Sequence, residues 1–364
     1  MRNALTPNQG AVLLFTFMTG SSIINIPAPL ISFSHAGAWI SLLASTALGL
    51  MLLYPIVWLA DRYPDMTYVQ YASKLIGRPL AIVLGLLFLS LQLEMIAGIT
   101  MDIALFLKSS MMRNTEHTVF IILIIMAVAL TVRAGLGQIA GMFGLLMASV
   151  MIFVVFNISL SSLNLNWHFL LPVVNEGMKP LLHGIYFTFG FPYGEIVLFS
   201  MILPYVKRKP NDRTGRKMAL ALLLNSASLL IVTLITLMTF GPLAGERKYS
   251  MFEVARTIEV TEIFQRFEAL MGYSMIVASF MKAAIVFFCA HLTLNQILGV
   301  PQDNRQLTFP LALLCSVIAI SVGIRGEAYW NFIVSGIHPM WGITCAVLPL
   351  LLLYLVSLFR KKKA

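Results

Sequence analysis

Charged residues are scarce in this chain of 364 residues, because Lys, Arg, Asp and Glu together make up only 11% of it. Hydrophobic residues make up 59%, and the mean hydropathy is +0.87. A soluble protein needs far more polar side chains on its surface. The scarcity of charge therefore excludes a soluble globular protein. It predicts an all-α polytopic membrane protein, because helices satisfy their backbone hydrogen bonds internally within lipid.

Cysteine is equally rare: Cys289, Cys315 and Cys345 are the three in the chain. All of them lie inside apolar stretches, and none has the CxxC or metal-type spacing of a redox or zinc site. The six histidines are scattered singly. No nucleophile–base pair and no cluster of metal ligands is evident in the sequence. We therefore expect neither an enzyme nor a bound metal or other cofactor.

Apolar stretches long enough to cross a bilayer as helices, roughly 20 residues each, follow one another along the chain. Ten such spans are predicted, at residues 10–33, 37–60, 80–107, 118–134, 138–162, 181–205, 217–243, 267–297, 307–324 and 331–358. Together they predict a single membrane domain over residues 1–364, which ends in a short basic tail at 359–364.

Lys and Arg are unequally divided between the two sides of this arrangement. With the N-terminus inside, 16 of the 25 basic residues fall on the inner side and 8 on the outer side, and Lys282 remains inside a span. Cytoplasmic loops carry the excess of Lys and Arg in membrane proteins. Both termini are therefore expected in the cytoplasm, and the net charge of +10 does not imply a nucleic-acid partner.

The sixth span is interrupted at its centre, which reads Gly190-Phe191-Pro192-Tyr193-Gly194-Glu195. Pro192 has no N–H for the helix and clashes with the preceding turn. A carboxyl group at this depth costs roughly 2.5–3.5 kcal/mol on insertion. Irregular backbone inside a membrane is tolerated where it is buried in protein or lines a cavity. The segment therefore indicates either two half-helices that meet at a binding site or a proline kink whose carboxyl group serves packing.

The first span is interrupted as well, within the run Thr19-Gly20-Ser21-Ser22-Ile23-Ile24-Asn25-Ile26-Pro27-Ala28-Pro29. Gly20 and the two serines break the apolar pattern, and Asn25 is suited to cap a new helix. Pro27 and Pro29 fit the first turn of a helix better than its interior. Taken alone, this segment also allows a simple proline kink.

The two interrupted spans lie five spans apart, and such pairs point to an inverted-repeat transporter fold. Two short amphipathic segments agree with this arrangement. One lies at 66–76, and the other lies at 250–264 and opens with a capping-box pattern, Ser250-Met251-Phe252-Glu253. We expect them on opposite membrane surfaces of a five-plus-five inverted repeat, with a first repeat at about 10–162 and a second at about 181–358.

Ionisable side chains inside other spans are candidates for the same site. Glu94 lies near the middle of the third span, and Gly98 and Asp102 follow on the same face of the helix. Asp102 is nearer the outer end, and a hydrated mouth residue is expected there. Lys282 lies in the middle of the eighth span, too deep to reach an interface, so it should face a cavity or a carboxylate such as Glu94 or Glu195. A static ion pair and a proton-switched site both remain open.

The two interruptions carry a resemblance to a known family. Gly20-Ser21-Ser22-Ile23-Ile24 resembles the G-S-G-I-F signature in the first helix of the amino acid/polyamine/organocation transporters, with Ser22 in place of the second glycine. The segment from Gly190 to Glu195 is similar to the break in their sixth helix, which often carries a Gly-Phe-Glu. The ten spans, the Leu-Thr-Pro-Asn-Gln start at 5–9 and the Lys-rich tail look most like the B subunits of spore germinant receptors.

This resemblance implies a LeuT-like fold with broken helices 1 and 6, and a small ligand of the amino acid class held between helices 1, 3, 6 and 8. It also implies the inner membrane of the spore as the location, and an A-type membrane subunit and a lipoprotein C-type subunit as partners. Together with the ionisable residues inside the spans, it gives the predicted ligand-binding residues Gly20, Ser21, Ser22, Ile23, Ile24, Glu94, Gly190, Phe191, Tyr193, Gly194, Glu195 and Lys282.

Two classes of function remain open at this point. In the first, the chain is a ligand sensor within a receptor complex that triggers germination. In the second, it is a proton-coupled amino acid transporter that works alone. One fold and one binding site serve either class, because a fold does not fix a function.

Overall fold

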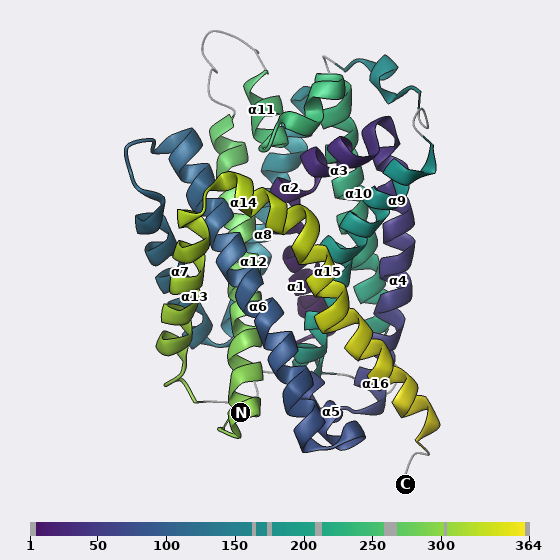
Figure 1. Ribbon diagram of the computed structural model, residues 1–364, viewed down its shortest axis with the longest axis vertical. Helices are drawn as coiled ribbons and strands as arrows, with labels where there is room; N and C mark the ends of the chain where they lie inside the picture. Colours follow the sequence, from purple (N-terminus) through teal and green to yellow (C-terminus); the bar gives the residue numbers. More distant parts are fainter. Residues whose placement is uncertain are drawn as a thin grey trace.

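The computed structural model describes residues 5–161, 165–172, 177–207, 213–257, 268–301 and 304–360. These residues form an all-α bundle, elongated along the direction of its long helices (Figure 1). Seven of the described helices are long and apolar enough to cross a membrane, and the apolar helix Thr308–Ile324 is somewhat shorter. The predicted fold class, an all-α polytopic membrane protein, is confirmed.

The helices of the first half, up to the loop after residue 161, include one interrupted span and four continuous ones. They are α1 (Pro7–Thr19), α2 (Ser22–Asn25), α3 (Pro27–Ser34), α4 (Ala38–Arg62), α5 (Tyr68–Ile76), α6 (Arg78–Phe106), α7 (His117–Ala134) and α8 (Leu136–Ser161).

The second half begins with another interrupted span. It ends with a span in which short helical segments, from α14 to α16, follow one another directly. Its elements are α9 (Met178–Thr188), η5 (Phe189–Tyr193), η6 (Gly194–Met201), α10 (Thr214–Phe240), η8 (Gly241–Glu246), α11 (Ser250–Arg256), α12 (Glu268–Leu298), α13 (Thr308–Ile324), α14 (Glu327–Phe332), η9 (Ile333–Ile337), α15 (His338–Gly342), η10 (Ile343–Val347) and α16 (Leu348–Phe359).

Both predicted interruptions are present in the backbone. Gly20, with φ −33° and ψ −105°, ends α1, and α2 follows as a single turn. Pro27 then occupies the first position of α3, where its missing N–H costs nothing. The expectation that Asn25 caps this helix was wrong, because the capping residue is Ile26 and the Asn25 side chain bonds elsewhere. In the sixth span Phe191 is extended, with φ −142° and ψ 111°.

The short helices α5 and α11 lie at opposite ends of the bundle, here called the α5 end and the α11 end (Figure 1). α5 begins with a capping box formed by Thr67 and Gln70. The capping box predicted for Ser250 and Glu253 was wrong: the helix begins one residue too early for it, and the Ser250 hydroxyl donates to the carbonyl of Arg247. The rest of the predicted segment, 258–264, lies outside the described residues.

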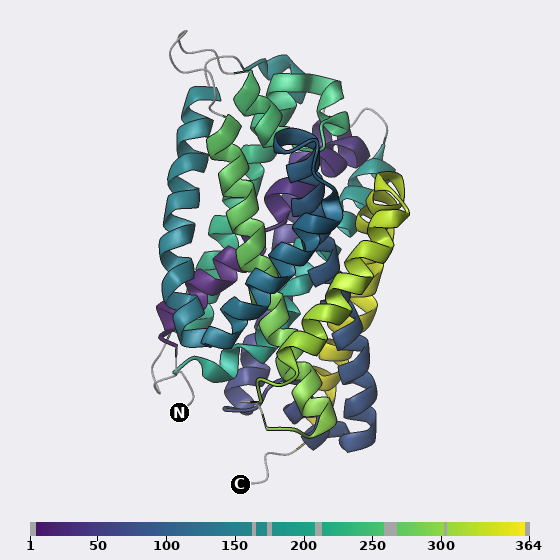
Figure 2. The same ribbon diagram turned by 90° about the vertical axis from the view of Figure 1, so that its left-hand side faces the viewer.

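α12 is the most enclosed of the seven long spans. Of its most apolar 18-residue stretch, 83% is buried inside the protein, against 33–50% for the other six. Figure 2 shows the bundle from the side, where blue helices of the first half and green helices of the second half are interleaved. Because its neighbours separate α12 from lipid, a charged side chain in the middle of this helix has to find its partners inside the protein.

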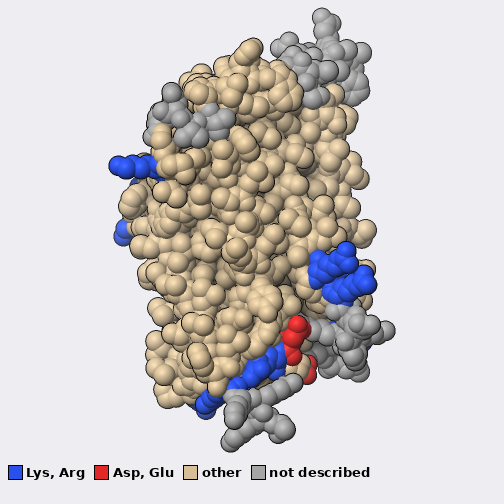
Figure 3. All heavy atoms as spheres, turned by 90° about the vertical axis from the view of Figure 1, so that its right-hand side faces the viewer, with Lys and Arg blue, Asp and Glu red and all other residues tan. Residues whose placement is uncertain are grey.

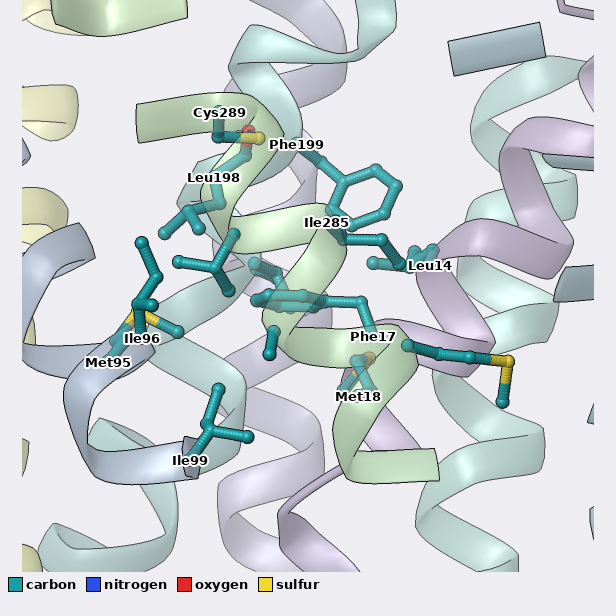
Figure 4. Close-up of a cluster of buried hydrophobic side chains, with 14 of the residues drawn as sticks. Leu14, Phe17, Met18, Met95, Ile96, Ile99, Leu198, Phe199, Ile285 and Cys289 are labelled. Atoms are coloured by element: carbon teal, nitrogen blue, oxygen red, sulfur yellow. Dashed lines mark hydrogen bonds between the residues drawn. The ribbon is translucent and has the colours of Figure 1, made fainter. Parts of the chain in front are cut away.

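An apolar cluster fills the space between α1, α6, η6 and α12. In Figure 4 the side chains of these four elements point toward one another, and the labelled members are Leu14, Phe17, Met18, Met95, Ile96, Ile99, Leu198, Phe199, Ile285 and Cys289. Phe17 and Phe199 meet edge to face, with ring centroids 5.5 Å apart. The cluster joins the first and sixth spans on one side of their interruptions.

The outer surface of the bundle suits a lipid environment. Large apolar side chains are exposed along the spans, among them Leu86, Leu123, Leu145, Leu313 and Leu352. On the face shown in Figure 3, described charged side chains lie near the lower end, at the left edge, and at the right side just below mid-height, and uncharged surface covers most of the rest. A largely uncharged surface of this extent suits a protein that faces hydrocarbon over most of this side.

Candidate functional site

A pocket lies beside both interruptions, with about 280 Å³ of empty space including the part that is open to solvent. It brings together the break after α1, the middle of α6, the break at Phe191 within η5, and the span from α14 to α15. The lining residues are Ser21, Asn25, Glu94, Met95, Gly98, Ile99, Asp102, Phe191, Glu195, Trp330, Val334 and His338. Irregular backbone therefore lines a cavity here, as expected of a membrane-embedded binding site.

A continuous chain of ionisable side chains runs from the pocket into the core. Glu94, whose side chain is 24% exposed, accepts from Nδ1 of His338 at 2.7 Å. Nε2 of His338 bonds Oε1 of Glu195 at 3.0 Å. The other oxygen of Glu195 accepts from Nζ of Lys282 at 2.6 Å. Four side chains from α6, α15, η6 and α12 are thus joined by three short contacts.

Lys282 is fully buried, and its ammonium group has an enclosed environment. Its Nζ lies 5.1 Å from the ring centroid of Phe17 and 4.6 Å from that of Phe191, so two aromatic faces supplement the carboxylate. Gly20 makes room for the stem of the lysine, because a Cβ at this position would lie 2.4 Å from Cβ of Lys282. Residue 20 therefore has to be glycine for α12 and Lys282 to pass this close to the break in the first span.

Asp102 forms a second polar cluster on the same face of α6. One of its oxygens accepts from the amide of Asn25 in α2, and the other accepts from the indole N–H of Trp330 in α14 at 2.6 Å. The expectation of a hydrated mouth residue was wrong, because the Asp102 residue is only 1% exposed. Trp330 covers it by packing onto Gly98, one turn away on α6.

Four of the predicted ligand-binding residues line the pocket: Ser21, Glu94, Phe191 and Glu195. Lys282 lies directly behind them, in contact with Glu195. The prediction that Glu94, Gly98 and Asp102 share one face of a helix is confirmed, since all three line this pocket.

The other predicted residues are buried around the breaks without lining this pocket. Ser22 donates its hydroxyl to the carbonyl of Met18 at 2.5 Å. The hydroxyl of Tyr193 bonds Thr46 at 2.8 Å and Ser226 at 2.7 Å, on the side facing α4 and α10. The remaining members are packed within the core: Gly20 beside Lys282, Ile23 and Ile24 in the apolar core, Gly190 against Pro339, and Gly194 beside the carbonyl of Phe189.

His338 and Trp330 are pocket residues that the sequence reasoning missed. His338 was one of six histidines treated as scattered, although it stands inside the last apolar span beside Pro339. An ionisable residue at such a position is a candidate for function by default, and this signal was available. Trp330 carries no comparable signal, because its role depends on contact with Asp102, which is 228 positions away in the chain.

The arrangement offers complementary groups for a small polar molecule. The carboxyl group of Glu94, which is partly exposed to the pocket, is an acceptor for a cationic group, and Ser21 at the break presents a hydroxyl. Met95, Ile99 and Val334 supply apolar walls. Among the described residues, no group of three or more His, Cys, Asp and Glu side chains is arranged to hold a metal ion.

Several solved transporters have a similar fold. A nucleobase-cation-symport-1 family transporter with bromovinylhydantoin bound has a TM-score of 0.65 and 15% identity, over 91% of this chain and 74% of the other. MhsT in complex with L-phenylalanine has a TM-score of 0.63 and 12% identity, over 96% and 98% of the two chains. A mutant manganese transporter of Eremococcus coleocola also has a TM-score of 0.63, with 16% identity over 100% and 82%. At these identities the likeness concerns the fold, which is that of LeuT-like transporters.

Similar sequences are germination proteins. Spore germination protein KB of Bacillus subtilis (strain 168) is 23% identical over 359 residues, which cover 97% of this chain and 94% of the relative. Spore germination protein XB of Bacillus anthracis is 22% identical, over 94% of each chain. Residues 4–324 match the family described as spore germination protein. The chain therefore belongs to the spore germination protein family, a non-enzymatic family of B-type membrane subunits, and it folds like a transporter.

Proposed function

We propose that this chain is the B subunit of a spore germinant receptor, and that it binds a small nutrient of the amino acid class in the pocket beside its two interrupted spans. The proposal rests on the series of side-chain contacts from Glu94 through His338 and Glu195 to Lys282. These contacts connect the pocket to both breaks. Binding in the pocket changes the contacts of these groups and thereby transmits the signal that triggers germination.

The ligand's ammonium group faces the carboxyl group of Glu94. Its carboxylate faces Ser21, where the interruption after Gly20 leaves backbone N–H groups without a preceding helical carbonyl. The ligand side chain lies against Met95 and Ile99. Support for an amino acid comes from MhsT, a structural neighbour solved in complex with L-phenylalanine. The predicted residues that do not line the pocket act by shaping the two breaks.

The proposed topology has ten transmembrane segments in two inverted repeats, at about 10–162 and 181–358, with both termini and the tail 359–364 in the cytoplasm. The opposite placement of α5 and α11, each in the connection after the second span of its repeat, supports this symmetry. The proposed location is the inner membrane of the spore. Family membership supports assembly with an A-type and a C-type receptor subunit there.

The proposal is tested in spores that lack the native subunit and carry either the wild-type chain or the Glu94→Gln variant. Germination is followed across a panel of amino acids. A hydrogen bond to a charged group contributes about 1.5–3 kcal/mol, so Glu94→Gln should raise the half-maximal germinant concentration by roughly tenfold or more. Glu116→Gln, at an exposed carboxyl group, is the matched control and should leave the response unchanged. An unchanged response of Glu94→Gln would contradict the proposal.

The alternative is a proton-coupled amino acid transporter that acts alone, which the likeness to solved transporters favours. Uptake into proteoliposomes by the purified chain distinguishes the two functions. A receptor subunit should bind the nutrient without accumulating it, and should trigger germination only with its partner subunits present. Accumulation of an amino acid driven by a pH gradient, with no partner added, would favour the transporter.

A further inference from the structure

The ionisable groups at the pocket do not balance in charge. Within the described part of the chain, three acids (Glu94, Asp102 and Glu195) and two bases (Lys282 and His338) lie in the pocket or directly behind it. With every group ionised, this cluster carries one net negative charge inside a membrane-spanning bundle. A net buried charge is costly there, so one further positive charge is required.

The charged groups just outside the cluster do not supply this charge. Lys248 and Glu327, before α11 and at the start of α14, form an ion pair at 2.8 Å, so the charge of the lysine is already compensated. The phenol of Tyr249 also faces Asp102 and is uncharged at neutral pH. Glu94 is the other acid on the same face of α6, and its partner is His338.

Of the three acids, Asp102 is the one whose carboxyl group contacts no cationic side chain among the described residues; Lys248 acts on it from a distance and is itself paired with Glu327. Glu195 contacts both Lys282 and His338, and Glu94 contacts His338 and is partly open to the pocket. Asp102 is 1% exposed, and both groups that bond it, the Asn25 amide and the Trp330 indole, are neutral. An ionised carboxylate buried among neutral donors is the least stable of the three, because desolvation disfavours its charged form.

We propose that Asp102 is a proton-binding site and carries a proton in this arrangement of the pocket. The surrounding hydrogen bonds accommodate the added hydrogen. The oxygen and nitrogen of the Asn25 amide are interchangeable by a half-turn, so that the amide oxygen accepts from the Asp102 O–H while Trp330 still donates to the other oxygen. With this proton bound, hydrogen bonds between uncharged side chains connect α2, α6 and α14. Its loss places an uncompensated charge beneath Trp330, which opens this side of the pocket.

Infrared spectroscopy of the purified full-length protein at neutral pH tests this proposal without any ligand. The chain has five aspartates, Asp61, Asp65, Asp102, Asp212 and Asp303, of which Asp102 alone lies inside a predicted span. The wild-type protein should show the carbonyl stretch of a protonated carboxyl group, and incorporation of ¹³C-aspartate should shift it. The band should disappear in Asp102→Asn and persist in Asp65→Asn, the matched control at the α5 end.

The isotope shift in the wild-type protein decides the question even if Asp102→Asn fails to fold. A neutral-pH spectrum without a carboxylic acid band would overturn the proposal. A band that shifts with ¹³C-glutamate and not with ¹³C-aspartate would also overturn it, because the proton would then reside on a glutamate. The infrared measurement uses no germinant. Its result can therefore be interpreted even if the proposed receptor function is wrong.

Discussion

Nζ of Lys282 lies 2.6 Å from Oε2 of Glu195, and both side chains are almost completely shielded from solvent. The pair joins the centre of α12 to the break in the sixth span, and the lysine stem passes beside Gly20 at the break in the first span. Because His338 holds the other oxygen of the same carboxylate, the ion pair connects both interruptions to the pocket. It is therefore the point at which the two interruptions and the pocket meet.

Substitution of one member of the Lys282–Glu195 ion pair should destabilise the protein strongly. Lys282→Met leaves the buried charge of Glu195 with His338 as the one partner that remains from this series of contacts. The variant should therefore lose about 3–5 kcal/mol of folding stability. The double variant Lys282→Met with Glu195→Gln removes both charges and keeps a hydrogen bond to His338, so it should regain most of the folded protein. Thermal unfolding in detergent measures both. A single variant as stable as wild type would refute the importance of the pair.

Substitution of Gly20 by alanine should disturb the site for steric reasons. The new Cβ would lie 2.4 Å from Cβ of Lys282 and 3.0 Å from the carbonyl oxygen of Ala278, neither of which is a flexible chain end. Overpacking of this kind costs about 1–3 kcal/mol. Gly141→Ala in α8 is the matched control, since nothing lies within 4 Å of its added Cβ. Comparison of their unfolding temperatures and germinant responses checks the prediction, and equal effects of the two variants would contradict it.

Germinant response should not require sodium. The ammonium group of Lys282 already places a positive charge beside the break in the first span, next to Phe17 and Glu195. No additional cation is then needed to balance the carboxylate of Glu195. Spores should respond equally in sodium buffer and in potassium buffer free of sodium. A strict sodium requirement, with normal response restored by added sodium chloride, would show that Lys282 does not supply this charge.

The α5 end and the α11 end should be accessible from opposite sides of the membrane. Cysteines introduced at Lys74 in α5 and at Arg256 in α11, both on exposed surfaces, should react with an impermeant reagent from the cytoplasmic and the external side respectively. The three native cysteines are buried, so the wild-type chain serves as the unlabelled control. Labelling of both introduced cysteines from one side would rule out the proposed topology.

Local physical chemistry made much of the fold predictable from sequence. Long apolar spans determine the class of protein, because lipid admits helices whose backbone bonds are internal. Gly20 and Pro192 mark the two breaks, since glycine and proline act on the backbone of their own segment. The depth of Lys282 in its span predicted a buried partner, and Glu195 was among the two carboxylates named.

Tertiary structure alone decided which groups meet at the site. His338 pairs with Glu94 across 244 positions, and Trp330 reaches Asp102 across 228. Such contacts depend on how the last span packs onto α6, which no local pattern encodes. For the same reason Asp102, whose position near a helix end suggested hydration, is buried beneath Trp330, and Asn25 bonds Asp102 instead of capping α3. The sequence by itself determined where polar groups enter the membrane, and the packing of distant helices determined the partners that make them stable there.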